Sequence, residues 1–310
     1  MTAAPLLTGR VVASHGRDAS IEDDSGRRIH CRLQGRRLAV VCGDRVHWSL
    51  ASTEGGTGVI VEVLPRTRVL ARIDARGVAE PVAANLTQLV AVVAPVPTPD
   101  FGLCDRYLAA AEWSGLAACV VANKSDLPDP TGALGPPLAD YVAHRLHRPQ
   151  CQQAAGGWHC RALAARLAGA TSVLVGQSGV GKSSLTNRLA PGVEATVAEI
   201  TRASESGRHT TTTSSLYALP TGGDLIDSPG VRDFSPPLPP AREIAGGYRE
   251  IAGVAAGCRF RDCLHRSEPG CAVAVACKEG LISTRRFESY QRLLALAESL
   301  AARAPPHLRR

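Results

Sequence analysis

Hydrophobic and polar residues alternate over short stretches in the first 64 residues of the chain. Four of these stretches read as strands separated by Gly-, Asp- and Ser-containing turns: Arg10–Ala13, Arg28–Leu33, Asp44–Leu50 and Gly58–Val63. Several short strands at this spacing predict a small barrel or sandwich. A five-stranded OB-like β-barrel fits the length, and the pattern also leaves an SH3-like barrel open.

The pattern changes from about residue 65 to residue 236. Leu89–Ala94 and Leu116–Ala122 are continuous apolar runs, as expected of strands buried on both faces. They alternate with shorter predicted strands and with helices: strands Ser172–Val175, Leu216–Leu219 and Asp224–Ile226, and helices Asp105–Ser114, Arg161–Leu167 and Lys182–Leu189. This alternation predicts an α/β domain with a mostly parallel sheet.

A proline-rich stretch, Ser235–Pro240, marks a further boundary. Beyond it come helical segments, a cluster of cysteines and a last helix over about Ser283–Ala302. We therefore expect three domains in the 310 residues: an OB-like barrel over 1–64, an α/β domain over 65–236 and a mostly α domain over 237–310.

A phosphate-binding loop follows the predicted strand Ser172–Val175 and precedes a predicted helix. It consists of Gly176, Gln177, Ser178, Gly179, Val180, Gly181, Lys182, Ser183 and the adjoining Ser184. The glycines let backbone N–H groups converge on phosphate oxygens, and the helix N-terminus adds its positive dipole. Lys182 is expected to reach the β- and γ-phosphates, and the Ser183 hydroxyl to bind Mg²⁺.

A second motif, Asn123-Lys124-Ser125-Asp126, follows the apolar run Leu116–Ala122 and predicts a guanine-binding site. A carboxylate at Asp126 can accept hydrogen bonds from both N1–H and N2–H₂ of guanine. Adenine offers no such pair, so ATP would leave the carboxylate without a partner. The motif thus argues against the alternative of a P-loop ATPase or small-molecule kinase.

Two further segments are expected to sense the γ-phosphate. Asp227 begins the sequence Asp-Ser-Pro-Gly, in which the aspartate holds Mg²⁺ and the Gly230 N–H faces the phosphate. Between the P-loop and Asp227 lies a threonine-rich stretch with the character of a switch, containing His209, Thr210, Thr211 and Thr212. One of these threonines, assigned here as Thr211, is expected to join the Mg²⁺ shell.

The group that orients the attacking water is not the usual one. Many GTPases place a glutamine directly after the glycine of this motif, whereas here the residue is Val231. We therefore expect slow intrinsic hydrolysis. His209 is the best candidate by residue type for the catalytic role, and a group supplied by a partner is the alternative.

The order of the motifs is itself informative. In a conventional GTPase the guanine motif comes last, but here Asn123–Asp126 precedes the P-loop. The same sheet can form if the old termini are joined and the chain is opened elsewhere, because chain termini often lie close together. The sequence therefore predicts a circularly permuted GTPase domain.

A metal site is predicted in the C-terminal part. Cys258, Cys263, His265 and Cys271 offer three thiolates and one imidazole, a set that suits one structural Zn²⁺ ion. Cys277 falls outside this spacing and is expected to pack in the core.

The charge of the chain is uneven. Lys and Arg number 35 against 28 Asp and Glu, and residues 237–310 alone carry 12 basic and 7 acidic side chains. This excess fits a polyanionic partner such as nucleic acid. No run of apolar residues is long enough to span a membrane and no signal peptide is evident, so we expect a cytoplasmic protein with no membrane partner. Nothing indicates an oligomer, and a monomer is expected.

The chain resembles the ribosome small-subunit-dependent GTPase A family, also called RsgA or YjeQ, over nearly its whole length. The resemblance lies in the cysteine cluster and in the segments Gly43–Val46, Asp105–Leu108, Asn123–Asp126, Gly176–Ser184, Gly207–Thr212 and Asp227–Arg232. It implies an OB fold, a permuted GTPase and a zinc-binding domain. It also implies GTP/GDP binding and a catalytic His209.

The same resemblance implies a partner. Members of this family bind the 30S ribosomal subunit and its 16S rRNA late in maturation, and the subunit stimulates their GTP hydrolysis. A nucleotide-gated RNA-binding scaffold with negligible turnover is the alternative, and Val231 is the residue that motivates it.

Overall fold

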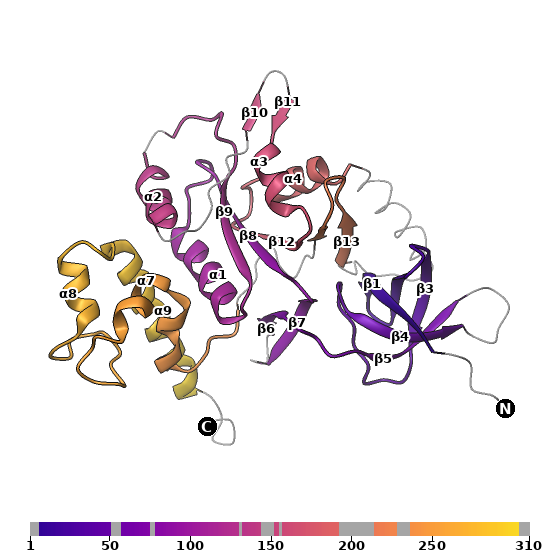
Figure 1. Ribbon diagram of the computed structural model, residues 1–310, viewed down its shortest axis with the longest axis horizontal. Coiled ribbons are helices and arrows are strands. Elements are labelled where there is room, and N and C mark those ends of the chain that lie inside the picture. Colours follow the sequence, from indigo (N-terminus) through magenta and orange to yellow (C-terminus); the bar gives the residue numbers. More distant parts are fainter. Residues whose placement is uncertain are drawn as a thin grey trace.

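The computed structural model describes residues 6–50, 57–74, 78–129, 132–143, 160–191, 214–227 and 236–303, and the backbone of 152–154 and 157–159. Figure 1 shows a β-barrel at one end of the molecule, a sheet flanked by helices in the middle and a group of helices at the other end. Both predicted changes of pattern along the chain therefore correspond to changes of architecture.

The N-terminal strands close into a five-stranded barrel. They are β1 (Leu7–His15), β2 (Asp18–Asp23), β3 (Arg28–Leu33), β4 (Arg45–Leu50) and β5 (Gly58–Val63). The pairings β1–β2, β2–β3, β3–β5, β5–β4 and β4–β1 return to the first strand, which confirms the OB-like barrel. Ile21, Trp48 and Ile60 fill its interior. The sequence pattern missed β2 because only Ala19 and Ile21 of its six residues are buried and the others are charged or polar.

The central sheet continues directly from the barrel. Its order is β13–β14–β12–β8–β9, and β1 of the barrel pairs with β13. The strands β8 (Gln88–Val93), β9 (Ala117–Ala122), β12 (Thr171–Val175) and β14 (Asp224–Asp227) are parallel, and β13 (Ser214–Ala218) runs antiparallel to β14. The predicted parallel sheet is therefore correct.

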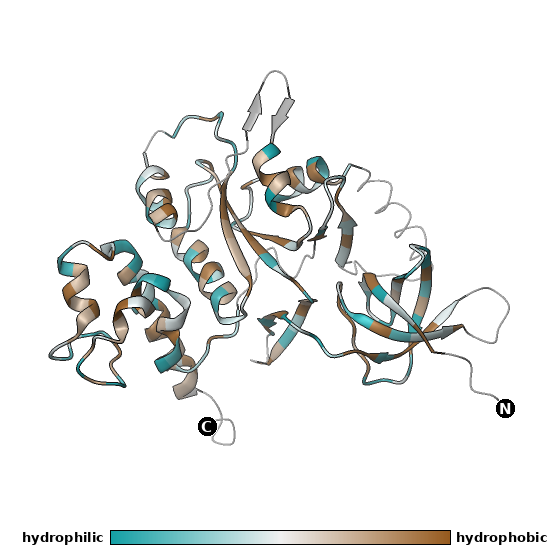
Figure 2. Ribbon diagram, viewed as in Figure 1, coloured by the Kyte–Doolittle hydropathy of each residue, from teal (hydrophilic) through white to brown (hydrophobic). Residues whose placement is uncertain are grey.

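Helices cover both faces of this sheet because its strands are apolar on both sides. Leu89 and Ala91 of β8 share a core with α1 (Phe101–Trp113) and α2 (Gly135–Ala143). Val90 and Val92 point the other way. They pack with α3 (Arg161–Leu167) and α4 (Lys182–Leu189). The central strands are mainly hydrophobic in Figure 2. The carboxyl ends of the parallel strands consequently meet at one edge, where the predicted motifs follow.

Two hairpins were not predicted from the sequence. One joins β6 (Val69–Ile73) to β7 (Ala79–Ala84) and leads from the barrel to β8. The other joins β10 (Gln152–Ala154) to β11 (Gly157–His159). Pro81 and the shortness of β10 and β11 weaken the strand pattern in each case.

The C-terminal part is helical, as predicted. It contains the 3₁₀ helix η1 (Ala241–Gly247), α7 (Arg249–Ala255), α8 (Ala272–Lys278) and α9 (Thr284–Arg303). Tyr248, Tyr290 and Leu294 form its core, which extends to Ala109 of α1. None of the described helices combines the length and the hydropathy needed to span a membrane.

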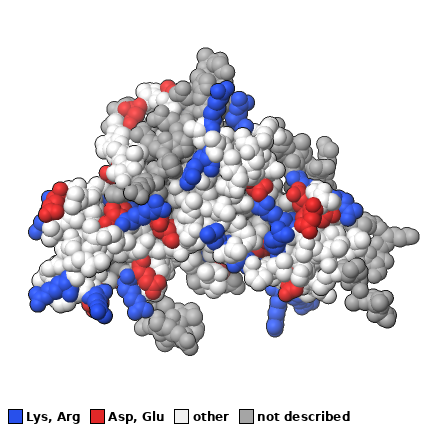
Figure 3. Space-filling view, viewed as in Figure 1, with Lys and Arg blue, Asp and Glu red and all other residues white. Residues whose placement is uncertain are grey.

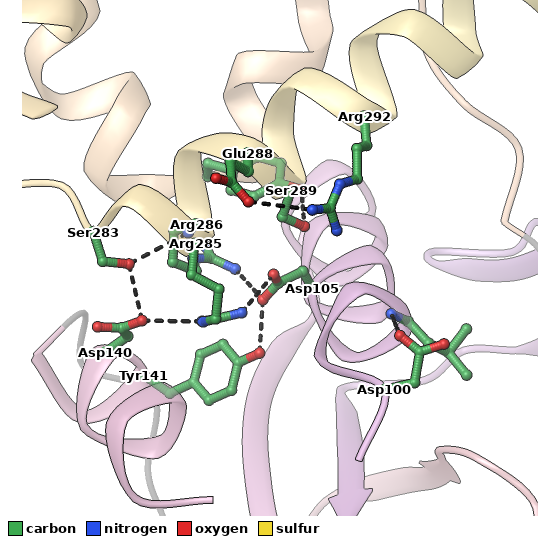
Figure 4. A network of polar contacts seen from close by, with 12 residues as sticks. Asp100, Asp105, Asp140, Tyr141, Ser283, Arg285, Arg286, Glu288, Ser289 and Arg292 are labelled. Carbon is green, nitrogen blue, oxygen red and sulfur yellow. Dashed lines mark hydrogen bonds and ion pairs between the residues drawn. The ribbon is translucent and has the colours of Figure 1, made fainter. Parts of the chain in front are cut away.

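A buried network of charges attaches α9 to α1 and α2 (Figure 4). The Asp105 carboxylate, fully buried, accepts hydrogen bonds from Arg286 at 2.6 Å, Arg285 at 2.9 Å and the Tyr141 hydroxyl at 2.7 Å. Burial opposes the charge of Arg286, but Asp105 and Glu250 outweigh it and raise the pKa of Arg286. The helical part is thus held by more than its proline-rich connection.

Candidate nucleotide site and candidate metal centre

The P-loop connects β12 to α4, as the sequence predicts. Gly181 stands directly before α4 with φ 93°, in the left-handed region. A Cβ atom there would lie 2.5 Å from the side-chain nitrogen of Asn123. Only glycine allows both the turn and this close approach.

The side chains of the P-loop surround a cavity of about 330 Å³. It is lined by Lys124, Ser178, Gly179, Gly181, Lys182, Ser183 and Ser184. The Lys182 ammonium donates to the carbonyls of Gly176 at 2.5 Å and Gln177 at 2.8 Å, which holds it across the loop. Ser178, Ser183 and Ser184 are exposed toward solvent. The cavity thus combines a cation, hydroxyl groups and a helix N-terminus, a combination that suits phosphate.

The guanine motif lies against the P-loop. Buried Asn123 follows β9 and donates its amide to the Val180 carbonyl at 2.8 Å. Lys124 has a left-handed backbone, with φ 55°, and its ammonium reaches the carbonyls of Gly179 at 2.7 Å and Val96 at 3.0 Å. The structure therefore brings together two motifs that are far apart in the sequence.

The remaining residues of the motif face outward. Ser125 and Asp126 are exposed in the turn after Lys124, where the Leu127 N–H donates to the Lys124 carbonyl. Asp126 thus lies two residues after Lys124, which lines the cavity. The hydrogen bond from Lys124 to the Val96 carbonyl could not be predicted from the sequence, because every residue carries a backbone carbonyl.

Asp227 lies beside the P-loop at the end of β14. The parallel register pairs Ile226 with Val173 of β12, so Asp227 is level with the last residues of the strand that enters the loop. The predicted Mg²⁺ ligands therefore belong to neighbouring units of the sheet: Ser183 lies in the first turn of α4, after the loop that follows β12, and Asp227 is the last residue of β14. His209, Thr210, Thr211, Thr212, Gly230 and Val231 lie outside the described residues.

The four predicted metal ligands come together in the C-terminal part. Ligand atoms of Cys258, Cys263, His265 and Cys271 all lie within 4.8 Å of one another. The Sγ atoms of Cys258 and Cys271 are 3.9 Å apart, and His265 Nδ1 lies 3.5 and 3.6 Å from them. Tetrahedral Zn²⁺ places neighbouring sulfurs about 3.8 Å apart and sulfur and nitrogen about 3.6 Å apart. The donor set and its spacing fit this ion.

Other cysteines belong to the cores. Burial raises the pKa of Cys31, Cys42 and Cys104 to about 12 and that of Cys119 to about 11. These groups are therefore neutral thiols at physiological pH and poor nucleophiles. Cys277 lies outside the four-ligand cluster.

Fold and motifs together define a P-loop GTPase of the circularly permuted class, with its guanine motif before its P-loop. Residues 63–236 match the RsgA GTPase family. The small ribosomal subunit biogenesis GTPase RsgA of Pseudomonas aeruginosa strain LESB58 is 42% identical over 292 residues, covering 94% of this chain and 86% of that protein. The protein of the same name from Chromohalobacter salexigens is 44% identical over 297 residues, with the same coverage. The chain belongs to the RsgA GTPase family.

Solved structures agree with this assignment. YjeQ from Thermotoga maritima superposes with a TM-score of 0.75 at 30% identity, covering 94% of this chain and 99% of that one. YloQ, described as a circularly permuted GTPase, has the same fold, with a TM-score of 0.71 at 24% identity and 97% coverage of each chain. Membership in a GTPase family does not favour the alternative of a scaffold with negligible turnover.

Proposed function

We propose that the chain binds the 30S ribosomal subunit and its 16S rRNA and assists late maturation of that subunit. In this proposal the subunit stimulates GTP hydrolysis, and hydrolysis leads to release. The single observation that carries the nucleotide part is the contact of Asn123 and Lys124 with the P-loop carbonyls. It supports one pocket that reads both guanine and phosphate. The names of the RsgA relatives, small ribosomal subunit biogenesis GTPases, support the ribosomal part.

The roles of the site residues follow from their chemistry. Backbone N–H groups of Gly176–Ser184 and the Lys182 ammonium would hold the phosphates, and Asp126 would read the base. Ser183, Thr211 and Asp227 would hold the Mg²⁺ ion that accompanies GTP. That ion would neutralise phosphate charge during transfer. Thr210, Thr212 and Gly230 would respond to the γ-phosphate as parts of the two switches.

His209 would orient the attacking water. Its imidazole can accept a proton or hydrogen bond near neutral pH, whereas Val231 offers no polar atom. We therefore expect hydrolysis to depend on the arrangement of the segment that carries His209. A partner that orders this segment would accelerate the reaction.

The zinc proposal rests on the geometry of the Cys₃His cluster. Zn²⁺ bound to Cys258, Cys263, His265 and Cys271 would fill all four positions with protein ligands, so its role would be structural. We place the domain boundaries near residue 64, where the barrel strands end, and near residue 236, where the proline-rich connection begins. The protein would act in the cytoplasm as a monomer.

Charge supports a polyanionic partner. On the face shown in Figure 3, basic side chains occur over all three parts of the molecule and are mixed with acidic ones. Such a distribution favours contacts at several places over one continuous basic patch.

Co-sedimentation with purified 30S subunits tests the ribosomal proposal. The chain is expected to pellet with the subunit in the presence of a non-hydrolysable GTP analogue and to stay in the supernatant with GDP. Parallel samples with 50S subunits give the background. Equal recovery with both nucleotides, or with both subunits, would contradict the proposal.

A further inference from the structure

Strand β1 belongs both to the barrel and to the GTPase sheet. It pairs with β2 and β4 inside the barrel, and its far end pairs with β13 through Ala13–Ser215 and Ser14–Ser214. Strand β13 is followed by β14, which ends at Asp227. The barrel is thus hydrogen-bonded to the sheet that carries the nucleotide site.

A bulge in β1 directs neighbouring side chains into two cores. The pairing register between β1 and β2 shifts between Val11 and Ala13, which leaves Val12 as the extra residue. Val11 points into the barrel core, while Val12 is buried with Leu216 and Ile226 of the GTPase sheet. Because well-packed interiors resist deformation, the barrel and the sheet are expected to move together.

Arg10 links the two strands that lead to the phosphate end of the site. Its guanidinium donates to Asp224 at 2.5 Å and to the Thr171 hydroxyl at 3.0 Å. Thr171 and Asp224 are the first residues of β12 and β14 and are paired across the sheet. Strand β12 ends at the P-loop, and β14 ends at Asp227, about 10 Å from Asp224 at the usual rise per residue.

A second contact fixes the barrel from the other side. The Ala84 N–H donates to the Cys42 carbonyl at 3.0 Å, and the Asn85 amide donates to the Gly43 carbonyl at 2.9 Å. A Cβ atom on Gly43 would lie 2.1 Å from the Ala84 carbonyl oxygen, so the backbones touch. Two separate attachments limit rotation of the barrel about β1.

We propose that Arg10 is a positioning residue for GTP hydrolysis, through which the barrel sets the register of the P-loop strand against the strand that ends at Asp227. This inference rests on the proposed role of Asp227 toward Mg²⁺. A forked guanidinium can hold both strand ends at once, which a lysine ammonium does less well. A partner that displaces the barrel would act on the magnesium site through the same contact.

The test compares Arg10→Met with the wild-type chain in GTP hydrolysis at varied Mg²⁺ concentration. We expect the half-saturating Mg²⁺ concentration to rise and kcat to fall by about tenfold, with the KM for GTP nearly unchanged. Arg10→Lys is expected to recover part of the loss. Asp224→Asn should act in the same direction, and the double variant should be no worse than the more severe single variant.

Arg45→Met is the matched control, because Arg45 of β4 is the register partner of Arg10 on the adjacent strand β1 and its side chain is 57% exposed. It should behave as wild type. A lower melting temperature for Arg10→Met with unchanged Mg²⁺ dependence and kcat would overturn the proposal. If the wild-type chain hydrolysed no GTP, the proposed function would fail instead. Mg²⁺-dependent retention of fluorescent GDP would then be compared between Arg10→Met and the wild-type chain. Weaker retention by the variant would support the role of Arg10, and equal retention would overturn it.

Discussion

Three residues other than glycine adopt left-handed backbone conformations in the described part of the chain. They are Asn85 at the attachment of the barrel, Lys124 in the guanine motif and His265 in the metal cluster. Such a conformation is unfavourable for side chains with a Cβ atom and persists only where surrounding contacts hold it. Asn85 and Lys124 each hold a neighbouring backbone carbonyl through their side chains. Local strain thus coincides with the positions that join parts of the molecule.

At the residue scale, Asp126→Asn tests the reading of the base. The carboxylate accepts the two N–H donors of guanine, whereas an amide can donate to the additional carbonyl of xanthine. We expect GTP turnover to fall at least a hundredfold and turnover of xanthosine triphosphate to rise, measured as kcat/KM for both nucleotides.

Asp129→Asn is the control for this substitution. The Asp129 carboxylate accepts the backbone N–H groups of Ala133 and Leu134, so its role is local. It should leave the nucleotide preference unchanged. A preference for GTP that survives in Asp126→Asn would show that another group reads the base.

At this scale the sequence allowed the candidate site residues to be named, but it did not allow their contacts to be predicted. Residue types and spacing pointed to Lys182, Ser183 and Asp126, whose roles stay predictions, and to the three cysteines and one histidine that the structure brings together. The structure adds contacts of Asn123 and Lys124 to carbonyls of Val96, Gly179 and Val180. Every residue carries a carbonyl, so no sequence pattern distinguishes the ones that are used.

At the element scale, strong patterns were predicted well and weak ones were missed. The helices α3 and α4 have the predicted bounds, and β8 and β9 lie within a residue or so of theirs. The strands β8 and β9 are apolar at nearly every position, so they can be buried only as central strands with a core on each face. By contrast, β2 and the β6–β7 hairpin carry charges on exposed positions and depend on partners that are distant in the sequence. The hydrogen bonds from Arg285 and Arg286 of α9 to Asp105 likewise join residues that are 180 and 181 positions apart in the sequence.

The Asp105 network predicts how α9 is held in place. Asp105→Asn removes the buried carboxylate and leaves Arg285 and Arg286 without their shared anionic partner. Breaking a buried ion pair in this way lowers the free energy of unfolding by about 3–5 kcal/mol. We expect a loss of unfolding free energy of about this size in denaturant titrations followed by fluorescence. Tyr141→Phe should cost about 1 kcal/mol, because it removes one hydrogen bond.

Arg292→Ala gives the comparison for an exposed ion pair. Arg292 lies 3.2 Å from Glu288 with 75% of its side chain exposed, so the variant should lose less than about 1 kcal/mol. Similar losses for Asp105→Asn and Arg292→Ala would contradict the assignment of the buried network as the main attachment.

At the scale of the whole molecule, the barrel and the helical part lie at opposite ends and attach to different elements of the GTPase domain (Figure 1). The barrel joins β13 through β1, and the helical part joins α1 and α2 through Asp105. The motif order alone predicted the permutation. It could not predict these attachments, because they depend on packing between segments that are far apart in the sequence.

Removal of the metal is expected to affect the C-terminal part first. Elemental analysis should find about one zinc per chain, since three thiolates and one imidazole form a closed tetrahedral set. Cys263→Ser should lower this content and the melting temperature, because metal binding contributes directly to folding. Cys277→Ser is the matched control and should retain zinc. Equal zinc content in both variants would contradict the ligand assignment.

GTP hydrolysis by the purified chain, with and without 30S subunits, is the most direct test of the central claim. We expect slow turnover of GTP alone, strong stimulation by 30S subunits, no stimulation by 50S subunits and negligible turnover of ATP. Stimulation would mean that the subunit supplies or orders the water-orienting group that Val231 does not provide. Slow GTP turnover that 30S subunits leave unchanged would contradict the ribosomal function.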